Sequence, residues 1–120
     1  MSKIKVVNKY HLGRATKPPE GVVRRAIHRG TALGNPLPMK DSSQAERDRV
    51  CDGYEEWLPP KLLKNGAELA QFQELLAIVR DPTVQSLELI CFCAPKRCHG
   101  DTVKRLLELS SDLPYDPEVP

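Results

Sequence analysis

Long apolar runs and a large charge of one sign are both missing from this sequence. No apolar segment approaches the ~20 residues that a membrane-spanning helix needs. The first ten residues, MSKIKVVNKY, lack the apolar core of a signal peptide. A formal net charge of +2 is too small to indicate nucleic-acid binding by bulk electrostatics, although it leaves room for a local basic patch. We therefore expect a cytoplasmic protein that contacts no membrane.

The chain has four cysteines in 120 residues, and a disulfide framework is not expected. A chain of this length can bury one hydrophobic core without disulfides or a structural metal, and the cysteines of a cytosolic protein are normally reduced. Proline is abundant by contrast, and its eleven residues divide the sequence into short segments. The sequence predicts a single domain over residues 1–110, followed by a proline-rich tail over residues 111–120.

The spacing of apolar residues predicts six elements, in the order strand, strand, helix, helix, strand, helix. The expected strands cover residues 3–9, 22–29 and 86–93, and the expected helices cover residues 42–58, 66–80 and 98–110. Pro59 and Pro60 are expected to end the first helix, because a residue before proline avoids the α conformation. The last strand is almost continuously apolar, which is typical of burial on both faces. This order favours a small α/β fold, a short mixed or parallel sheet with about three helices packed on it, over an α+β arrangement.

Residues 91–101, CFCAPKRCHGD, form the predicted turn from the last strand into the last helix. In open α/β sheets, ligands gather at the carboxyl ends of the strands, and the first turn of a helix attracts anions. Placement and composition therefore single out this turn as the best candidate site in the chain. Three chemistries remain open for it.

Zinc binding is the first, because thiolate and imidazole are the usual zinc ligands. The candidate ligands are Cys91, Cys93, Cys98 and His99. Cys98 and His99 are neighbours whose side chains diverge, however, and the C-x2-C spacing of common structural zinc sites is missing. Cys91 and Cys93 are equally well explained as small core residues. No cofactor is certain from the sequence, and zinc is the one that it suggests.

A reactive thiol is the second chemistry. Cys98 adjoins Lys96, Arg97 and His99, whose charges favour the thiolate. His99 or Asp101 would be its catalytic partner.

Anion binding is the third. Lys96, Arg97 and the backbone N–H groups near Gly100 would hold a phosphate or a carboxylate. Asp101 would then contact a ribose hydroxyl, or simply stabilise the start of the helix.

A second glycine-bearing loop, HRGTALGNP at residues 28–36, suggests the same kind of ligand. Gly30 and Gly34 allow positive φ angles and a close approach of the backbone to a ligand. Arg29 can grip a phosphate or carboxylate with two parallel hydrogen bonds, and Asn35 can cap a turn or contact a polar group. Alone, this loop is better explained as a surface turn with a solvated arginine.

Together, the segments RGTALGNP, RDRVCDGYEEWL and LICFCAPKRCHGD resemble an uncharacterised family of bacteriophages and bacteria, a domain of unknown function. The resemblance covers residues 4 to 109 and is most specific in its Cys-x-Cys…Cys-His-Gly-Asp ending. The chain departs from the family pattern at His28, Leu37 and Phe92. A phage or prokaryotic origin and one shared pocket are what the resemblance implies; it supplies no reaction.

We expect the two loops to meet in one pocket, with Arg29 and Asn35 on one wall and the Cys-His turn on the other. The expected ligand is small, anionic and nucleotide-like, and the protein would either bind or modify it, so enzyme activity stays open. The alternative is a non-enzymatic protein that occupies a host partner in the host cytoplasm, with a structural or zinc-binding Cys/His cluster.

Overall fold

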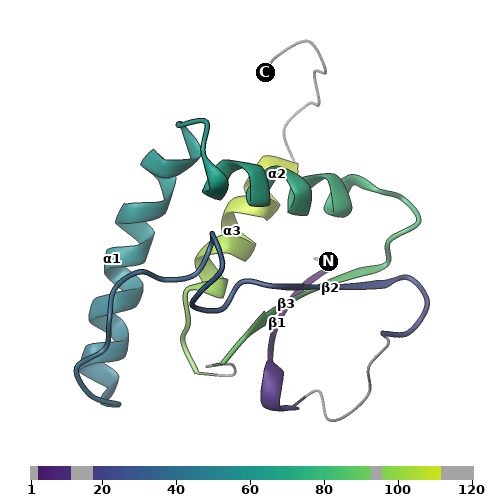
Figure 1. The fold of residues 1–120 in the computed structure, drawn as a ribbon. Coiled ribbons are helices and arrows are strands. Elements are labelled where there is room, and N and C mark those ends of the chain that lie inside the picture. The colour runs from purple at the N-terminus through teal and green to yellow at the C-terminus, as the bar shows by residue number, and fades with distance from the viewer. Residues whose placement is uncertain (1–2, 12–17, 93–95, 112–120) are drawn as a thin grey trace.

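A computed structural model describes residues 3–11, 18–92 and 96–111 of the chain (Figure 1). The strands are β1 (Ile4–Asn8), β2 (Val22–Ala26) and β3 (Ser86–Cys91), and the helices are α1 (Gln44–Leu62), α2 (Ala67–Arg80) and α3 (Gly100–Ser111), with one 3-10 turn at Lys9–His11. The predicted order of six elements and the single small α/β domain are confirmed. The predicted tail lies outside the described residues, apart from Ser111, which ends α3.

The three strands form one parallel sheet in the order β1-β3-β2, so β3 is the central strand (Figure 1). Leu87 of β3 stands beside Ile4 of β1 and Val23 of β2. Because all three strands run the same way, their carboxyl ends share one edge of the sheet. The connections that leave β2 and β3 therefore begin side by side, and this edge carries the site described below.

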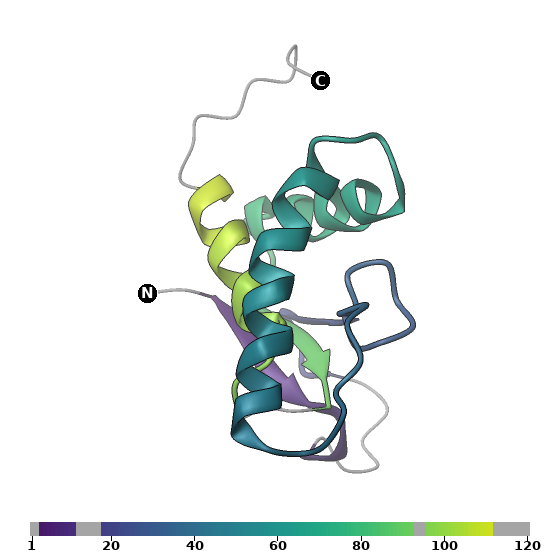
Figure 2. The same ribbon diagram turned by 90° about the vertical axis from the view of Figure 1, so that its left-hand side faces the viewer.

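The helices cover the face of the sheet on which Leu87, Leu89 and Cys91 point inward. Figure 2, viewed from the side of α1, shows this helix in front of α3 and the strands. The core on this face joins side chains of β1, β3, the three helices and the loop after β2: Ile4, Ile27, Leu33, Tyr54, Leu58, Phe72, Leu75, Leu87, Leu89, Val103 and Leu107. The alternate residues of β3 are only partly buried, and Glu88 there forms a 2.7 Å ion pair with Arg24 of β2. The prediction that β3 is buried on both faces is therefore wrong, because the apolar core lies against one face.

Helix α1 continues through Pro59 and Pro60, contrary to the prediction that they end it. Leu58 is fully buried and Leu62 packs against the core, so the last turn extends the apolar face of the helix. Both prolines lie exposed, where the carbonyl groups that lose an N–H partner are close to water. Burial of the leucines outweighs the local preference of the residues before proline.

The loop after β2 turns back on itself directly beyond the sheet. Ile27 still donates its N–H to the Ile90 carbonyl, and Thr31 then donates to the His28 carbonyl. Strand β2 is therefore shorter than the predicted 22–29. Gly30 has a φ of +97°, as such a tight turn requires.

None of the described helices is long and apolar enough to cross a lipid bilayer.

Replacing Gly34 should destabilise the fold, because a Cβ there would lie 2.5 Å from the His28 carbonyl oxygen and 2.9 Å from the Arg29 Cα. We expect Gly34→Ala to lower the free energy of unfolding by about 1–3 kcal/mol, the usual cost of forced overpacking. Urea unfolding followed by circular dichroism measures it. The matched control is Gly66→Ala, where a Cβ meets nothing within 4 Å and the change should stay below about 1 kcal/mol. Equal losses in the two variants would contradict this explanation.

Candidate functional site

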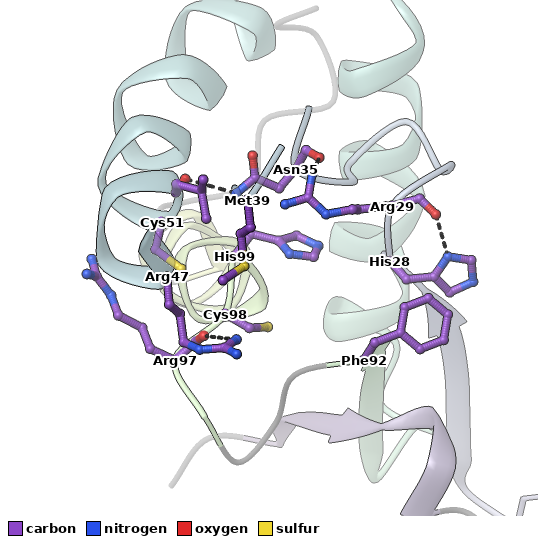
Figure 3. Close-up of a pocket in the computed structure, with 11 residues that line it drawn as sticks. His28, Arg29, Asn35, Met39, Arg47, Cys51, Phe92, Arg97, Cys98 and His99 are labelled. Atoms are coloured by element: carbon purple, nitrogen blue, oxygen red, sulfur yellow. Dashed lines mark hydrogen bonds between the residues drawn. The ribbon is translucent and has the colours of Figure 1, made fainter. Parts of the chain in front are cut away.

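A cavity of about 70 Å³ lies beyond the carboxyl edge of the sheet (Figure 3). Its lining comes from the loop after β2 (His28, Arg29, Asn35 and Met39), from α1 (Arg47, Val50 and Cys51) and from the connection between β3 and α3 (Phe92, Arg97, Cys98 and His99). The two loops singled out in the sequence thus lie around one cavity. The sequence did not indicate the contribution of α1.

Not every predicted site residue lines this cavity. Cys93 lies outside the described residues. Six predicted site residues are described but do not belong to the lining: Gly30, Gly34, Cys91, Lys96, Gly100 and Asp101. Gly34 and Gly100 serve packing instead: a Cβ on Gly100 would lie 2.8 Å from Val6 Cγ1. This glycine lets the start of α3 rest directly on β1.

His99 is the most constrained polar side chain of the site. Its side chain is buried, and its Nε2 lies within hydrogen-bond distance of the Ile27 carbonyl oxygen. A carbonyl only accepts, so Nε2 carries the hydrogen, and Nδ1 of the neutral ring is an acceptor. Burial lowers the pKa of His99, and the nearby positive charge of Arg29 lowers it further, against the opposing effect of the Ile27 carbonyl. The neutral ring is therefore the form that the fold favours.

Cys98 is buried and serves the start of α3. Its Sγ accepts the Gly100 N–H at 3.1 Å, and its own N–H donates to Asp101 Oδ2 at 3.3 Å. A hydrogen bond with the Cys91 side chain and burial both raise the Cys98 pKa. This arrangement does not support the expectation that neighbouring charges favour a thiolate, because the thiol is buried.

Arg97 is committed to helix α1. Its guanidinium makes ion pairs with Asp48 at 3.0 Å, Asp52 at 2.7 Å and Glu55 at 3.3 Å. In Figure 3 this group points away from His99. These carboxylates raise the Arg97 pKa, with Asp52 contributing most. Arg97 thus fastens the β3–α3 connection to α1, so the prediction that it holds an anion is not supported by this geometry.

Arg29 and Arg47 are the cations whose charge remains available at the cavity. Arg29 donates to the Asn35 carbonyl at 2.7 Å, and Arg47 lies 3.5 Å from the Arg97 carbonyl. Within the described part of the chain, neither forms an ion pair with a carboxylate, whereas Arg24, Arg25, Arg49 and Arg97 all do. Both guanidinium groups therefore give the cavity a positive potential.

Asn35 holds the loop in place and does not face a ligand. It is buried, its Nδ2 donates to the Val50 carbonyl at 2.9 Å, and its Oδ1 accepts the Leu37 N–H at 2.9 Å. Tyr54 adds a second tie, because its hydroxyl donates to the Leu33 carbonyl at 2.6 Å. These bonds hold the loop against α1 and leave the Asn35 amide committed to the backbone.

Aromatic side chains form a rim beside the cavity, consisting of Tyr10, His28 and Phe92. The His28 ring stacks on Phe92 with 4.7 Å between centroids, and Tyr10 lies 5.5 Å from Phe92 on the same measure. Tyr10 is 76% exposed and Phe92 38% exposed. Lys9 Nζ lies 5.7 Å from the Phe92 centroid. This aromatic rim is a surface on which a flat, partly apolar group can rest.

No group of three metal-ligating side chains comes together among the residues that the structure describes. Cys93, one of the four predicted zinc ligands, lies outside them. His99 Nε2 is already bonded to a carbonyl, and the Cys98 pKa is raised, whereas zinc takes the deprotonated thiolate. The described part of the predicted zinc site therefore does not fit the metal.

The buried state of Cys98 predicts slow alkylation of the native protein. We expect N-ethylmaleimide at pH 7.5 to label the Cys98 peptide at least tenfold more slowly in buffer than in 6 M urea, because the thiol must first be uncovered and ionised. Tryptic digestion and mass spectrometry follow the labelling. Rapid labelling of Cys98 in native buffer would show that the thiol is activated after all.

The neutral state of His99 predicts a pH dependence of stability. Because the folded-state pKa lies below the ordinary value of 6.5, the unfolded chain takes up the proton first as the pH falls. The free energy of unfolding should be highest above pH 6.5 and decrease below it, by up to about 1.4 kcal/mol per pH unit. Urea unfolding at several pH values measures this slope. His99→Gln should flatten it, and an unchanged slope in that variant would assign the effect to another group.

Comparison with known proteins identifies one family. The family model described as Domain of unknown function (DUF4326) matches residues 7–109. No curated protein and no solved structure matches the chain. The matched segment runs from the end of β1 into the last turn of α3 and includes every residue that lines the cavity. The chain therefore belongs to this family of unknown function.

Proposed function

We propose that the cavity binds one end of a small anionic, nucleotide-like ligand, with the negative group between Arg29 and Arg47. The observation that carries this proposal is that both guanidinium groups line the cavity without a carboxylate partner among the described residues. Guanidinium groups grip phosphates and carboxylates through parallel hydrogen bonds. Arg29 is exposed and Arg47 half-buried, and a cation without a carboxylate partner beside a hollow is well suited to an anion.

The size of the cavity decides how much of the ligand enters it. A volume of about 70 Å³ is roughly twice the share of one water molecule in the liquid, whereas pockets that enclose whole small molecules span about 300–1,000 Å³. Only a terminal group such as a phosphate fits inside. The remainder of the ligand would lie outside, where the aromatic rim offers a flat surface for a base.

Binding without chemistry and chemistry on the ligand both remain compatible with this proposal. The predicted catalytic group of Cys98, His99 and Asp101 is not assembled as a triad, since Cys98 caps α3 and Asp101 is outside the lining. His99 is the one member that faces the cavity with an available ring nitrogen. A phage or prokaryotic source and a cytoplasmic location stay predictions of the sequence, as does the alternative of a protein partner in the host.

The decisive test is whether Arg47 contributes specifically to anion binding. We expect the wild-type protein to bind nucleoside 5′-monophosphates and inorganic phosphate, measured by calorimetry or by chemical-shift changes. Arg47→Gln should weaken that binding about tenfold to a hundredfold, as expected for one hydrogen bond to a charged group.

The matched control removes the same charge elsewhere. Arg25 pairs with Glu74 at 2.7 Å on the exposed surface and does not line the cavity, so Arg25→Gln should leave the affinity nearly unchanged. Equal weakening by both variants would reduce the effect to bulk charge. If the wild-type protein binds no phosphate, the proposal is overturned. A pull-down experiment would then test the alternative of a protein partner.

A further inference from the structure

The His99 ring presents one committed nitrogen and one available nitrogen. Nε2 is held by the Ile27 carbonyl, and no hydrogen-bond partner of Nδ1 is found among the described residues. The residue is only 7% exposed, yet it lines the cavity. Figure 3 shows its ring beside the side chain of Arg29. Among the described residues, Nδ1 does not count as a fully buried atom without a partner, so it is reached from the cavity, and a donor on a ligand can take the place of water there.

The ring cannot easily escape this arrangement. A half-turn of the ring would place carbon Cε1 where Nε2 lies and break the bond to the Ile27 carbonyl. Tyr54 packs against it edge-on, with 5.2 Å between the ring centroids, and burial lowers its pKa so that it stays neutral. The fold therefore presents a fixed acceptor and not a donor at this point of the cavity wall.

The Arg29 guanidinium next to His99 Nδ1 limits the kind of ligand that can bind to both groups at once. Arg29 comes two residues after Ile27, so the segment that orients the imidazole also supplies the guanidinium. A cation attracts a negative group, and a neighbouring acceptor requires an O–H or N–H donor. A ligand that satisfies both carries a donor close to its charge, as a sugar phosphate does.

We propose that His99 Nδ1 is a specificity-determining contact, which selects hydroxyl-bearing phosphate esters, the sugar phosphates and nucleotides, over phosphates that lack a hydroxyl group. This inference rests on the proposed anion site, since Arg29 and Arg47 bring the phosphate to the ring. The ligand hydroxyl donates to Nδ1. In a protein that modifies its ligand, the same nitrogen is placed to take up the proton of that hydroxyl.

Protonation of His99 should abolish this preference, because Nδ1 then becomes a donor. The titratable or charged groups that act on the ring come from three elements: His28 and Arg29 from the loop, Tyr54 from α1, and Asp101 from α3. The preference is therefore expected above the His99 pKa and lost below it.

The experiment compares two ligands of equal charge, D-ribose 5-phosphate and n-pentyl phosphate, which differ in their hydroxyl groups. At pH 8 we expect the wild-type protein to bind ribose 5-phosphate about fivefold to tenfold more tightly by calorimetry. His99→Phe keeps an aromatic ring at this position but has no acceptor, so it should bind both ligands alike. Both ligands carry a phosphate monoester that titrates in the same pH range, so its protonation cancels in the ratio of the two affinities.

Each outcome separates this inference from the anion site. If both ligands bind equally to the wild-type protein, or if the preference persists in His99→Phe, the role of Nδ1 is refuted while the anion site stands. If neither ligand binds, the anion site itself fails. A ¹H–¹⁵N spectrum of the histidines in the wild-type protein tests the same contact without a variant. The neutral His99 ring should carry its proton on Nε2. Its Nδ1 signal should shift when ribose 5-phosphate is added. A proton on Nδ1 would overturn the proposal.

Discussion

The bond between the His99 imidazole and the Ile27 carbonyl holds the site together. It joins residues that are 72 positions apart in the chain and fastens the start of α3 to the exit of β2. Around it, Gly100 rests on Val6 and Ile27, and Tyr54 of α1 packs edge-on against the ring. Two loops and one helix are positioned relative to one another by this single contact and the packing that surrounds it.

The arginines at this edge of the sheet fall into two groups, and only one of them is paired with carboxylates. Arg97 meets three carboxylates of α1 and so serves the scaffold. Arg29 and Arg47, in contrast, bond to main-chain carbonyls, which position a guanidinium group without neutralising it. Arginine thus has two roles in this small area. An arginine that pairs with the carboxylates of α1 is structural, and an arginine that bonds only to carbonyls keeps its charge for a ligand.

Much of the fold could be predicted from local pattern, because the six elements each have a clear apolar period. The errors fall where tertiary contacts outweigh local preference. Pro59 and Pro60 stay inside α1 because Leu58 and Leu62 are buried on the core side. The one-sided burial of β3 could not be read from its residues, since a strand of apolar and small side chains fits either a two-layer or a three-layer arrangement.

The site could be located from the sequence but not assigned in detail. Glycine-bearing loops after two strands were sufficient to predict the edge of the sheet where the cavity lies. The duties of single residues were not predictable, because Arg97 meets Asp48, Asp52 and Glu55 only after α1 has docked, and burial reverses the expected effect of charge on Cys98. Arg47 was overlooked, although it lies one turn before Val50 on the helical segment that resembles the family.

The ties that close the site end on the main chain, and this has an evolutionary consequence. The carbonyls of Ile27, Leu33 and Val50 accept from His99, Tyr54 and Asn35, and every amino acid supplies such a carbonyl. The residues that supply only a carbonyl, at positions 27, 33 and 50, can therefore be replaced by others that fill the same space. The residues that donate through their side chains, at positions 99, 54 and 35, have few acceptable substitutes. Divergent relatives can accordingly change the apolar half of each contact while the polar half stays the same.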